Sequence, residues 1–223
     1  PRVGNGEELI RQMRYNLEVS DVKNLEGLSE TSIVKGGIDA IFESRDRVGL
    51  KIIRQKETLL DGFTLVNGLE ILKGDYQDRK ISLSARTNQS RGYWGNFSIS
   101  KGDYFGGNKT SWTSSIGKQF SNHLTLYGSA NQNIIFMPNQ GEFTANIYGL
   151  TAEVALNRKW FGKALIQYDN FSNQLQFYCR INWIHTPGSD LFIVINKLYD
   201  MSGNNNDQIQ NTQVLKLTYL FQI

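Results

Sequence analysis

The segment Gln174-Leu175-Gln176-Phe177-Tyr178-Cys179-Arg180-Ile181-Asn182-Trp183 decides the fold class, because apolar and polar side chains alternate along its whole length. Successive side chains of a β-strand point to opposite faces, so one face carries Leu, Phe, Cys, Ile and Trp. The other face carries Gln, Gln, Tyr, Arg and Asn. The pattern therefore predicts a strand with one apolar face and one wet face.

The same alternation recurs along most of the 223-residue chain. There are about twelve such segments, many of them close to the roughly nine to eleven residues that a tilted strand needs to cross a bilayer. The sequence shows no fixed-length repeat and no Pro-rich linker, which favours a single body. Clear examples of alternation are the segments 13–20, 48–52, 81–85, 93–99, 124–130 and 215–223.

Composition excludes several classes of protein. Gly, Asn, Ser, Thr, Tyr and Phe are abundant and are poor helix formers, which argues against an all-α fold. The net charge is only +3 and the basic residues are scattered, which argues against nucleic acid as a partner. No apolar run approaches the roughly 18 residues of a transmembrane helix, whereas the strands of a membrane barrel need only alternate. Cys179 is the only cysteine, so no internal disulfide is predicted, and no pair or cluster of residues suggests a metal site or another cofactor.

The expected connections alternate in length along the chain. Segments 57–78, 101–109, 131–141 and 199–210 read as long loops, whereas 120–122, 157–159 and 186–189 read as tight turns. Outer-membrane barrels have short periplasmic turns and longer extracellular loops. We therefore predict an all-β, antiparallel up-and-down transmembrane β-barrel of about twelve strands, with both termini on the periplasmic side of a bacterial outer membrane. Residues 1–11 are expected to form an irregular or briefly helical lead-in, and residues 12–223 the barrel or its C-terminal part.

The last segment carries apolar side chains at every second position up to the end of the sequence. These residues are Leu215, Leu217, Tyr219, Phe221 and Ile223. They resemble the C-terminal signal by which the barrel-assembly machinery recognises outer-membrane proteins, although Ile stands where Phe is commoner. The alternative is an ordinary amphipathic strand.

Several segments together resemble one family of bacterial outer-membrane proteins. They are Arg180 to Trp183, Pro187 to Val194, Leu215 to Phe221 and, more loosely, Asp61 to Tyr76 and Gly102 to Ser111. In that family a β-sandwich similar to a carbohydrate-binding module precedes a C-terminal barrel of uncharacterised function. The resemblance covers about Thr58 to Ile223 and implies that this chain is the barrel alone or its C-terminal part. The chain begins at Pro1 without Met, which we interpret as a mature form or a fragment.

Few residues suggest reaction chemistry. His123 and His185 are expected at the ends with tight turns, away from the extracellular rim where barrel enzymes place their catalytic groups, and the sequence lacks the common catalytic motifs. Asp200 and Asp207 are interpreted as residues of a solvated loop, with calcium binding as the alternative. Asp103 to Gly107 is interpreted as a plain loop, with a sugar contact as the alternative.

The predicted function is transport or binding at the outer membrane, with glycans as one candidate ligand class, or a scaffold role within an outer-membrane complex. No enzyme activity is predicted. The expected partners are outer-membrane lipid, the barrel-assembly machinery and other outer-membrane or periplasmic subunits. The alternatives are an enzyme with a barrel body and a soluble β-sandwich binding module.

Overall fold

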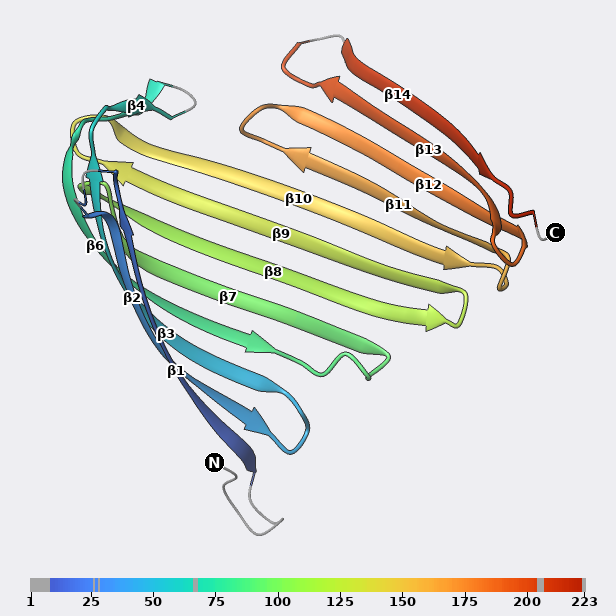
Figure 1. The fold of residues 1–223 in the computed structure, drawn as a ribbon, viewed down its shortest axis with the longest axis horizontal. Helices are drawn as coiled ribbons and strands as arrows, with labels where there is room; N and C mark the ends of the chain where they lie inside the picture. The colour runs from blue at the N-terminus through green and yellow to red at the C-terminus, as the bar shows by residue number, and fades with distance from the viewer. Residues whose placement is uncertain (1–8, 26, 28, 66–67, 204–206, 222–223) are drawn as a thin grey trace. The chain divides into compact units, whose positions relative to one another are not determined.

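The computed structural model describes residues 9–25, 27, 29–65, 68–203 and 207–221. Within these ranges the fold is all-β and contains no α-helix (Figure 1). In particular, no helix in the described ranges is long and apolar enough to cross a membrane. The predicted all-β class is therefore confirmed.

Twelve strands form one antiparallel sheet in which neighbours along the chain are neighbours in the sheet, apart from a small excursion between β3 and β6. This is the predicted up-and-down order, and its number of strands is also as predicted. The strands are β1 (Ile10–Lys23), β2 (Ser29–Phe42), β3 (Arg47–Leu59), β6 (Gly74–Arg86), β7 (Tyr93–Tyr104), β8 (Gly107–Ser121), β9 (Leu124–Met137), β10 (Gly141–Ala155), β11 (Trp160–Asp169), β12 (Gln174–Thr186), β13 (Ser189–Asp200) and β14 (Asp207–Thr218). The excursion contains a separate two-stranded sheet, β4 (Phe63–Thr64) and β5 (Glu70–Ile71).

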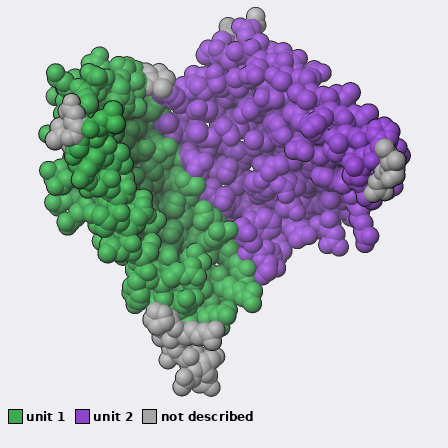
Figure 2. Space-filling view, in the orientation of Figure 1, with its two compact units in different colours: residues 1–88, 96–113, 132–144 green, residues 89–95, 114–131, 145–223 purple. Residues whose placement is uncertain are grey.

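The chain divides into two compact units, which Figure 2 shows in green and purple. Unit 1 comprises residues 1–88, 96–113 and 132–144, and unit 2 comprises residues 89–95, 114–131 and 145–223. Unit 1 contains β1 to β6, and unit 2 contains β11 to β14. Strands β7 to β10 contribute residues to both units, so the division falls within strands and not at a linker.

Strand β1 begins at Ile10, inside the predicted lead-in 1–11, of which residues 1–8 lie outside the described ranges. In the described residues, β1 and β14 stand at the two ends of the strand order. Each of them therefore has one hydrogen-bonded neighbour there, and the sheet is not closed into a barrel.

The predicted sorting of long and short connections holds only in part. The longest connection, residues 60–73 between β3 and β6, lies within the segment 57–78, as predicted. Two other expected loops are wrong, because strands extend through most of 101–109 and 131–141. Only residues 105–106 separate β7 from β8, and only 138–140 separate β9 from β10. The polar composition of these strand ends, which are rich in Gly and Asn, concealed their extended structure.

The tight turn predicted at Pro187-Gly188 is confirmed, since residues 187–188 alone separate β12 from β13. Gly188 has a φ of 83°, a backbone conformation that a residue with a side chain rarely adopts. Pro187 supplies the fixed φ that precedes it in such turns.

The buried apolar core of the described residues is small and lies under the hairpin formed by β4 and β5. Its members are Leu69 and Ile71 from the hairpin and Ile135 and Met137 from β9. Aromatic rings surround it, and Phe105 makes edge-to-face contacts with Phe63, Tyr76 and Tyr104 at 4.9–5.8 Å between ring centroids. The connection 60–73 is therefore packed onto unit 1 and is not an extended loop.

The two faces of the sheet differ sharply in both units. In unit 1, cross-strand pairing aligns Tyr15, Ile38, Leu50, Leu83 and Ile99 in one apolar row across β1, β2, β3, β6 and β7. In unit 2, Val154, Gly162, Ile181, Ile193 and Leu215 form a similar row across β10 to β14. Residues of these rows are largely exposed, as Leu50 at 39%, Ile181 at 41% and Leu215 at 71% illustrate. We name this side of the sheet the apolar face and the opposite side the polar face.

Candidate functional site on the polar face

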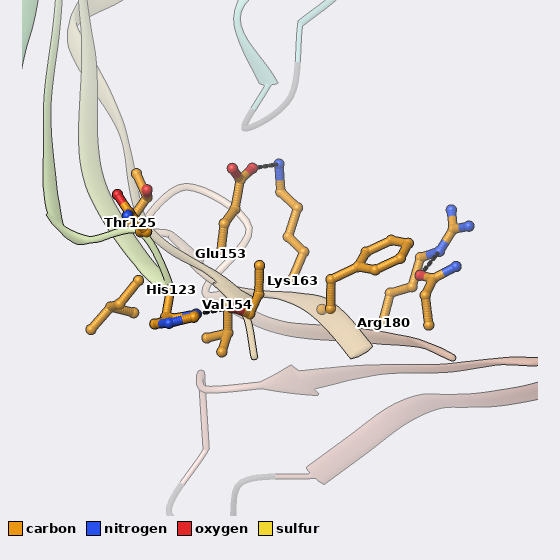
Figure 3. A pocket seen from close by; sticks show the side chains of 12 residues that line it. His123, Thr125, Glu153, Val154, Lys163 and Arg180 are labelled. Carbon is orange, nitrogen blue, oxygen red and sulfur yellow. Dashed lines mark hydrogen bonds and ion pairs between the residues drawn. The ribbon is translucent and has the colours of Figure 1, made fainter. Parts of the chain in front are cut away.

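A large pocket of unit 2, lined mainly by polar-face residues, lies near the turns that join β8 to β9 and β10 to β11. Its volume is about 600 Å³. Figure 3 shows its labelled side chains, which come from several neighbouring strands of unit 2. The lining residues are Asn122, His123, Leu124, Thr125, Glu153, Val154, Ala155, Phe161, Gly162, Lys163, Arg180 and Asn182. We name this cavity the polar-face pocket.

Lys163 of β11 is held in place by two hydrogen-bonding partners, one on β10 and one on β9. Its Nζ donates to Glu153 Oε1 at 3.0 Å, an ion pair that is visible in Figure 3, and to the hydroxyl of Tyr127 at 2.9 Å. Glu153 and Lys163 are direct cross-strand partners in β10 and β11, a position in which opposite charges attract. Both side chains are nearly half exposed, so the pair orients the two groups toward solvent at little energetic gain.

Arg180 and Asn182 form a second polar group in the pocket. Arg180 Nε donates to the buried Asn182 Oδ1 at 2.8 Å. The guanidinium of Arg180 also lies 5.0 Å from the ring centroid of Phe192, and Lys216 lies 5.7 Å from the same ring. These contacts fix the Arg180 plane while its remaining N–H groups stay free to bind acceptors.

His123 lies at the turn between β8 and β9, as expected, and it also lines the pocket. Its Nδ1 lies 2.6 Å from the carbonyl oxygen of Ala155, which makes Nδ1 the protonated nitrogen in a neutral ring. Thr125 contributes a hydroxyl group to the pocket, and Glu153 contributes a carboxylate. The arrangement provides hydrogen-bond donors and acceptors beside an exposed ring, Phe161, which suits the binding of a polar organic ligand.

The polar face of unit 1 also carries charged and amide side chains. Lys35 Nζ donates to Glu18 Oε1 at 2.8 Å across the β1–β2 pair. A smaller pocket of about 330 Å³ lies beside β3 and β6 and is lined by Asp39, Arg47, Lys51 and Arg86 among others. Glu18, Lys35 and Lys51 thus share the polar face of unit 1, whereas Arg54 and Arg79 form a directly opposed pair on its apolar face.

The predicted assembly-signal residues are brought together in part. Leu215 and Leu217 lie on β14 with their side chains about 71% exposed on the apolar face. Strand β14 ends at Thr218, so Tyr219 and Phe221 follow the strand instead of continuing it to the end of the chain. Their rings pack on each other with centroids 4.7 Å apart. Ile223 lies outside the described residues.

Two contacts of Leu220 explain why the pairing of β13 with β14 stops at Thr218. Leu220 N donates to the buried Ser189 Oγ at 3.0 Å, and the Leu220 side chain packs against Gly188. The chain after Thr218 therefore turns toward the β12–β13 turn.

The structure places the two ligand sites considered in the loops in different surroundings. Tyr104 and Phe105, the rings of the alternative sugar contact, pack against each other and against the aromatic cluster of unit 1. Asp200 and Asp207 are cross-strand partners at the end of β13 and β14. The Asp200 carboxylate accepts hydrogen bonds from the backbone N–H and the hydroxyl of Ser202. Among the described residues no group of three or more potential metal ligands occurs.

The polar-face pocket was not predicted from the sequence. Its charged members stand on separate strands, far apart in the chain, and each reads alone as an ordinary polar residue of an alternating strand. The register of β10, β11 and β12, which aligns Glu153, Lys163 and Arg180 in one cross-strand row, brings them together. The alternation itself was the available signal, because it assigns all three to the same face.

Comparison of the chain with protein-family models, with curated proteins and with solved structures gives no match.

Proposed function

We propose that the chain is an integral outer-membrane protein whose sheet closes into a β-barrel and whose polar face binds or conducts polar solutes, glycans among them. The single observation that carries the proposal is the exposed apolar face, which continues from strand to strand in each unit. A lipid bilayer is the surrounding that such a face requires. Both termini are proposed to lie in the periplasm.

The apolar face of unit 2 has the layered composition of a membrane-facing surface. At one end, Trp160 and Trp183 stack at 5.4 Å between ring centroids, in the row that continues to Leu191 and Leu217. At the other end, Tyr148, Tyr168 and Tyr199 share a row with Leu175. Of the three rows between them, those of Ile181 and Ala164 are mostly aliphatic, and the row of Ile166 also contains Lys197 and Asn211. Aromatic girdles on both sides of an apolar band mark the two lipid–water interfaces of outer-membrane barrels.

Strand length also supports the proposal. The strands of the main sheet are 10 to 15 residues long, from β11 to β8 and β10. A tilted strand needs about 9–11 residues to cross a bilayer. The unpaired edges of β1 and β14 cannot remain exposed in hydrocarbon, so the proposal requires each edge to pair in the membrane.

A soluble β-sandwich is the weaker proposal. A sandwich buries the apolar face of one sheet under a second sheet and forms its core there. Only Leu69, Ile71, Ile135 and Met137 are buried apolar residues in the described part of the chain, and they gather under the β4–β5 hairpin. No second layer covers the apolar face of either unit within the described residues.

Gel mobility and conductance test the proposal in two steps. The chain folded into detergent micelles should migrate faster unheated than boiled, because a closed barrel resists denaturation by the gel detergent. Insertion into planar bilayers should then separate a conducting barrel from a binding or scaffold protein. Equal mobility before and after boiling, together with solubility in the absence of detergent, would refute the membrane proposal.

The double variant Tyr219→Asp/Phe221→Asp tests the role of the C-terminal residues in assembly. We expect it to be depleted from the outer membrane, because it places two charges where the chain should present apolar rings to the assembly machinery and to lipid. The amount of heat-modifiable protein in isolated outer membranes is the measurement.

The matched control is Gln210→Asp/Thr212→Asp, which adds two carboxylates to the polar face of β14 opposite the uncharged residues Leu198 and Asn196. This control should reach near-normal levels. Equal depletion of both variants would argue against a specific role for the apolar C-terminal residues.

A further inference from the structure

Unit 1 contains a second pocket whose composition differs from the polar-face pocket. It has a volume of about 410 Å³ and is lined by Arg11, Gln12, Arg14, Ile41, Arg45 and Arg47. We name it the arginine pocket. It lies at the ends of β1, β2 and β3, the strands labelled in Figure 1, next to the turn 43–46. Four of its six lining residues are arginines.

Cross-strand register concentrates the positive charge further. Gln12, Ile41, Arg47 and Arg86 form the last polar-face row before the turn, so two guanidinium groups stand on directly opposed positions of β3 and β6. Like charges in directly opposed positions destabilise a sheet. Arg47 and Arg86 also line the adjoining pocket of about 330 Å³, so the two cavities share Arg47.

Two carboxylates near these arginines in the fold, Asp39 and Asp46, contact other groups. Asp39 on β2 is the direct cross-strand partner of Arg14 on β1. Its carboxylate instead lies against Gly49 on β3, where it fills the space that a Cβ at position 49 would occupy. Asp46 accepts hydrogen bonds from the Ser44 hydroxyl at 2.8 Å and from Asn88 N at 2.8 Å. Within the described ranges, no ion pair joins a carboxylate to any of the four pocket arginines.

From this arrangement we infer that the arginine pocket binds a phosphorylated ligand. A guanidinium presents a planar fork of N–H donors that matches the oxygens of a phosphate group in bidentate geometry. A phosphate ester carries up to about two negative charges and three strong acceptor oxygens, enough to engage several guanidinium groups at once. Its binding offsets the repulsion among Arg11, Arg14, Arg45 and Arg47.

The inferred site is independent of the proposed membrane function. The arginine pocket is formed by β1, β2, β3 and the turn 43–46 of unit 1 and involves none of the residues of the polar-face pocket. The phosphate group has two possible sources, a free organic phosphate or the headgroup of an anionic phospholipid, and the same guanidinium groups recognise either one.

Calorimetric titration of the full chain in non-ionic detergent tests the site, with inorganic pyrophosphate and a short-chain phosphatidic acid as separate probes. The test variant is Arg14→Gln/Arg47→Gln. The control is Arg54→Gln/Arg79→Gln, which removes the same charge from a directly opposed arginine pair of β3 and β6 on the other face of the sheet. Circular dichroism establishes that both variants are folded.

We expect the test variant to raise the dissociation constant of at least one probe by about tenfold or more, and the control to change it less than about twofold. Loss of pyrophosphate binding identifies a free phosphate as the source, whereas loss confined to the lipid probe identifies a headgroup. Absence of binding for both probes, or equal weakening in the two variants, would overturn the inference. Loss of heat-modifiable mobility with retained phosphate binding would count against the membrane proposal alone.

Discussion

Ile166→Arg is expected to lower the free energy of unfolding of the lipid-reconstituted protein by about 2 kcal/mol or more. Ile166 lies on the apolar face of β11, between the row that contains Tyr168 and the middle row that contains Ala164. Charged substitutions on the lipid face of outer-membrane barrels cost about 2–4 kcal/mol near the bilayer midplane and less near the interfaces. Denaturant titration in lipid vesicles measures the change.

The adjacent residue supplies a control that is nearly identical in chemistry. Leu165 precedes Ile166 on the same strand, and the leucine and isoleucine side chains are isomers. Leu165 shares the polar face with Thr151 and Tyr178. Leu165→Arg should cost about 1 kcal/mol or less, because its new charge meets water and polar groups. If both substitutions destabilise the protein equally, the apolar face is not specifically in contact with lipid.

Ile71→Ala is expected to destabilise the attachment of the β4–β5 hairpin by about 2–5 kcal/mol, the usual cost of truncating a fully buried aliphatic side chain. Ile71 is 1% exposed and packs in the small core with Leu69, Ile135 and Met137. Because that core joins the hairpin to the sheet, its loss should open the connection 60–73 and leave the sheet intact. Hydrogen exchange at the backbone amides of Leu65 and Ile71 measures the opening.

Leu72→Ala is the matched control, because Leu72 follows Ile71 directly and is 68% exposed. Its effect on exchange should correspond to about 0.5 kcal/mol or less. Equal protection of the Leu65 amide in wild type and in Ile71→Ala would mean that the buried cluster does not hold the hairpin. This experiment requires no assumption about a membrane.

Strands with strict alternation were well predicted, because a period of two requires no information beyond the local sequence. The segment Gln174 to Trp183 lies within β12, and its alternate residues do share one face with Trp160 and Ile193 of the neighbouring strands. The strand order followed as well, since tight turns between alternating segments leave neighbouring strands antiparallel. Which face meets water or lipid does not follow from the period alone.

Long-range packing was not predictable in the same way. Residues 57–78 read as a long loop, yet Leu69 and Ile71 contact Ile135 and Met137 from a distant strand. The ends of β7 and β8 read as loops because Gly106 and Gly107 suggest irregular backbone, while a two-residue connection there preserves the ladder. The arginine pocket depends on the register of three strands and on the direction in which Asp39 leans, neither of which the sequence specifies.

Quenching of single tryptophans by brominated lipid tests the central claim, that the apolar face contacts lipid, most directly. Trp183 lies on the apolar face beside Trp160, whereas Trp94 contacts Gly117 and shares the polar face. Two variants retain only Trp183 or only Trp94, with the other tryptophans replaced by Phe, and are reconstituted into vesicles whose acyl chains carry bromine near the headgroups. The account predicts strong quenching of Trp183 and little quenching of Trp94. Equal quenching of the two, or none of Trp183, would contradict it.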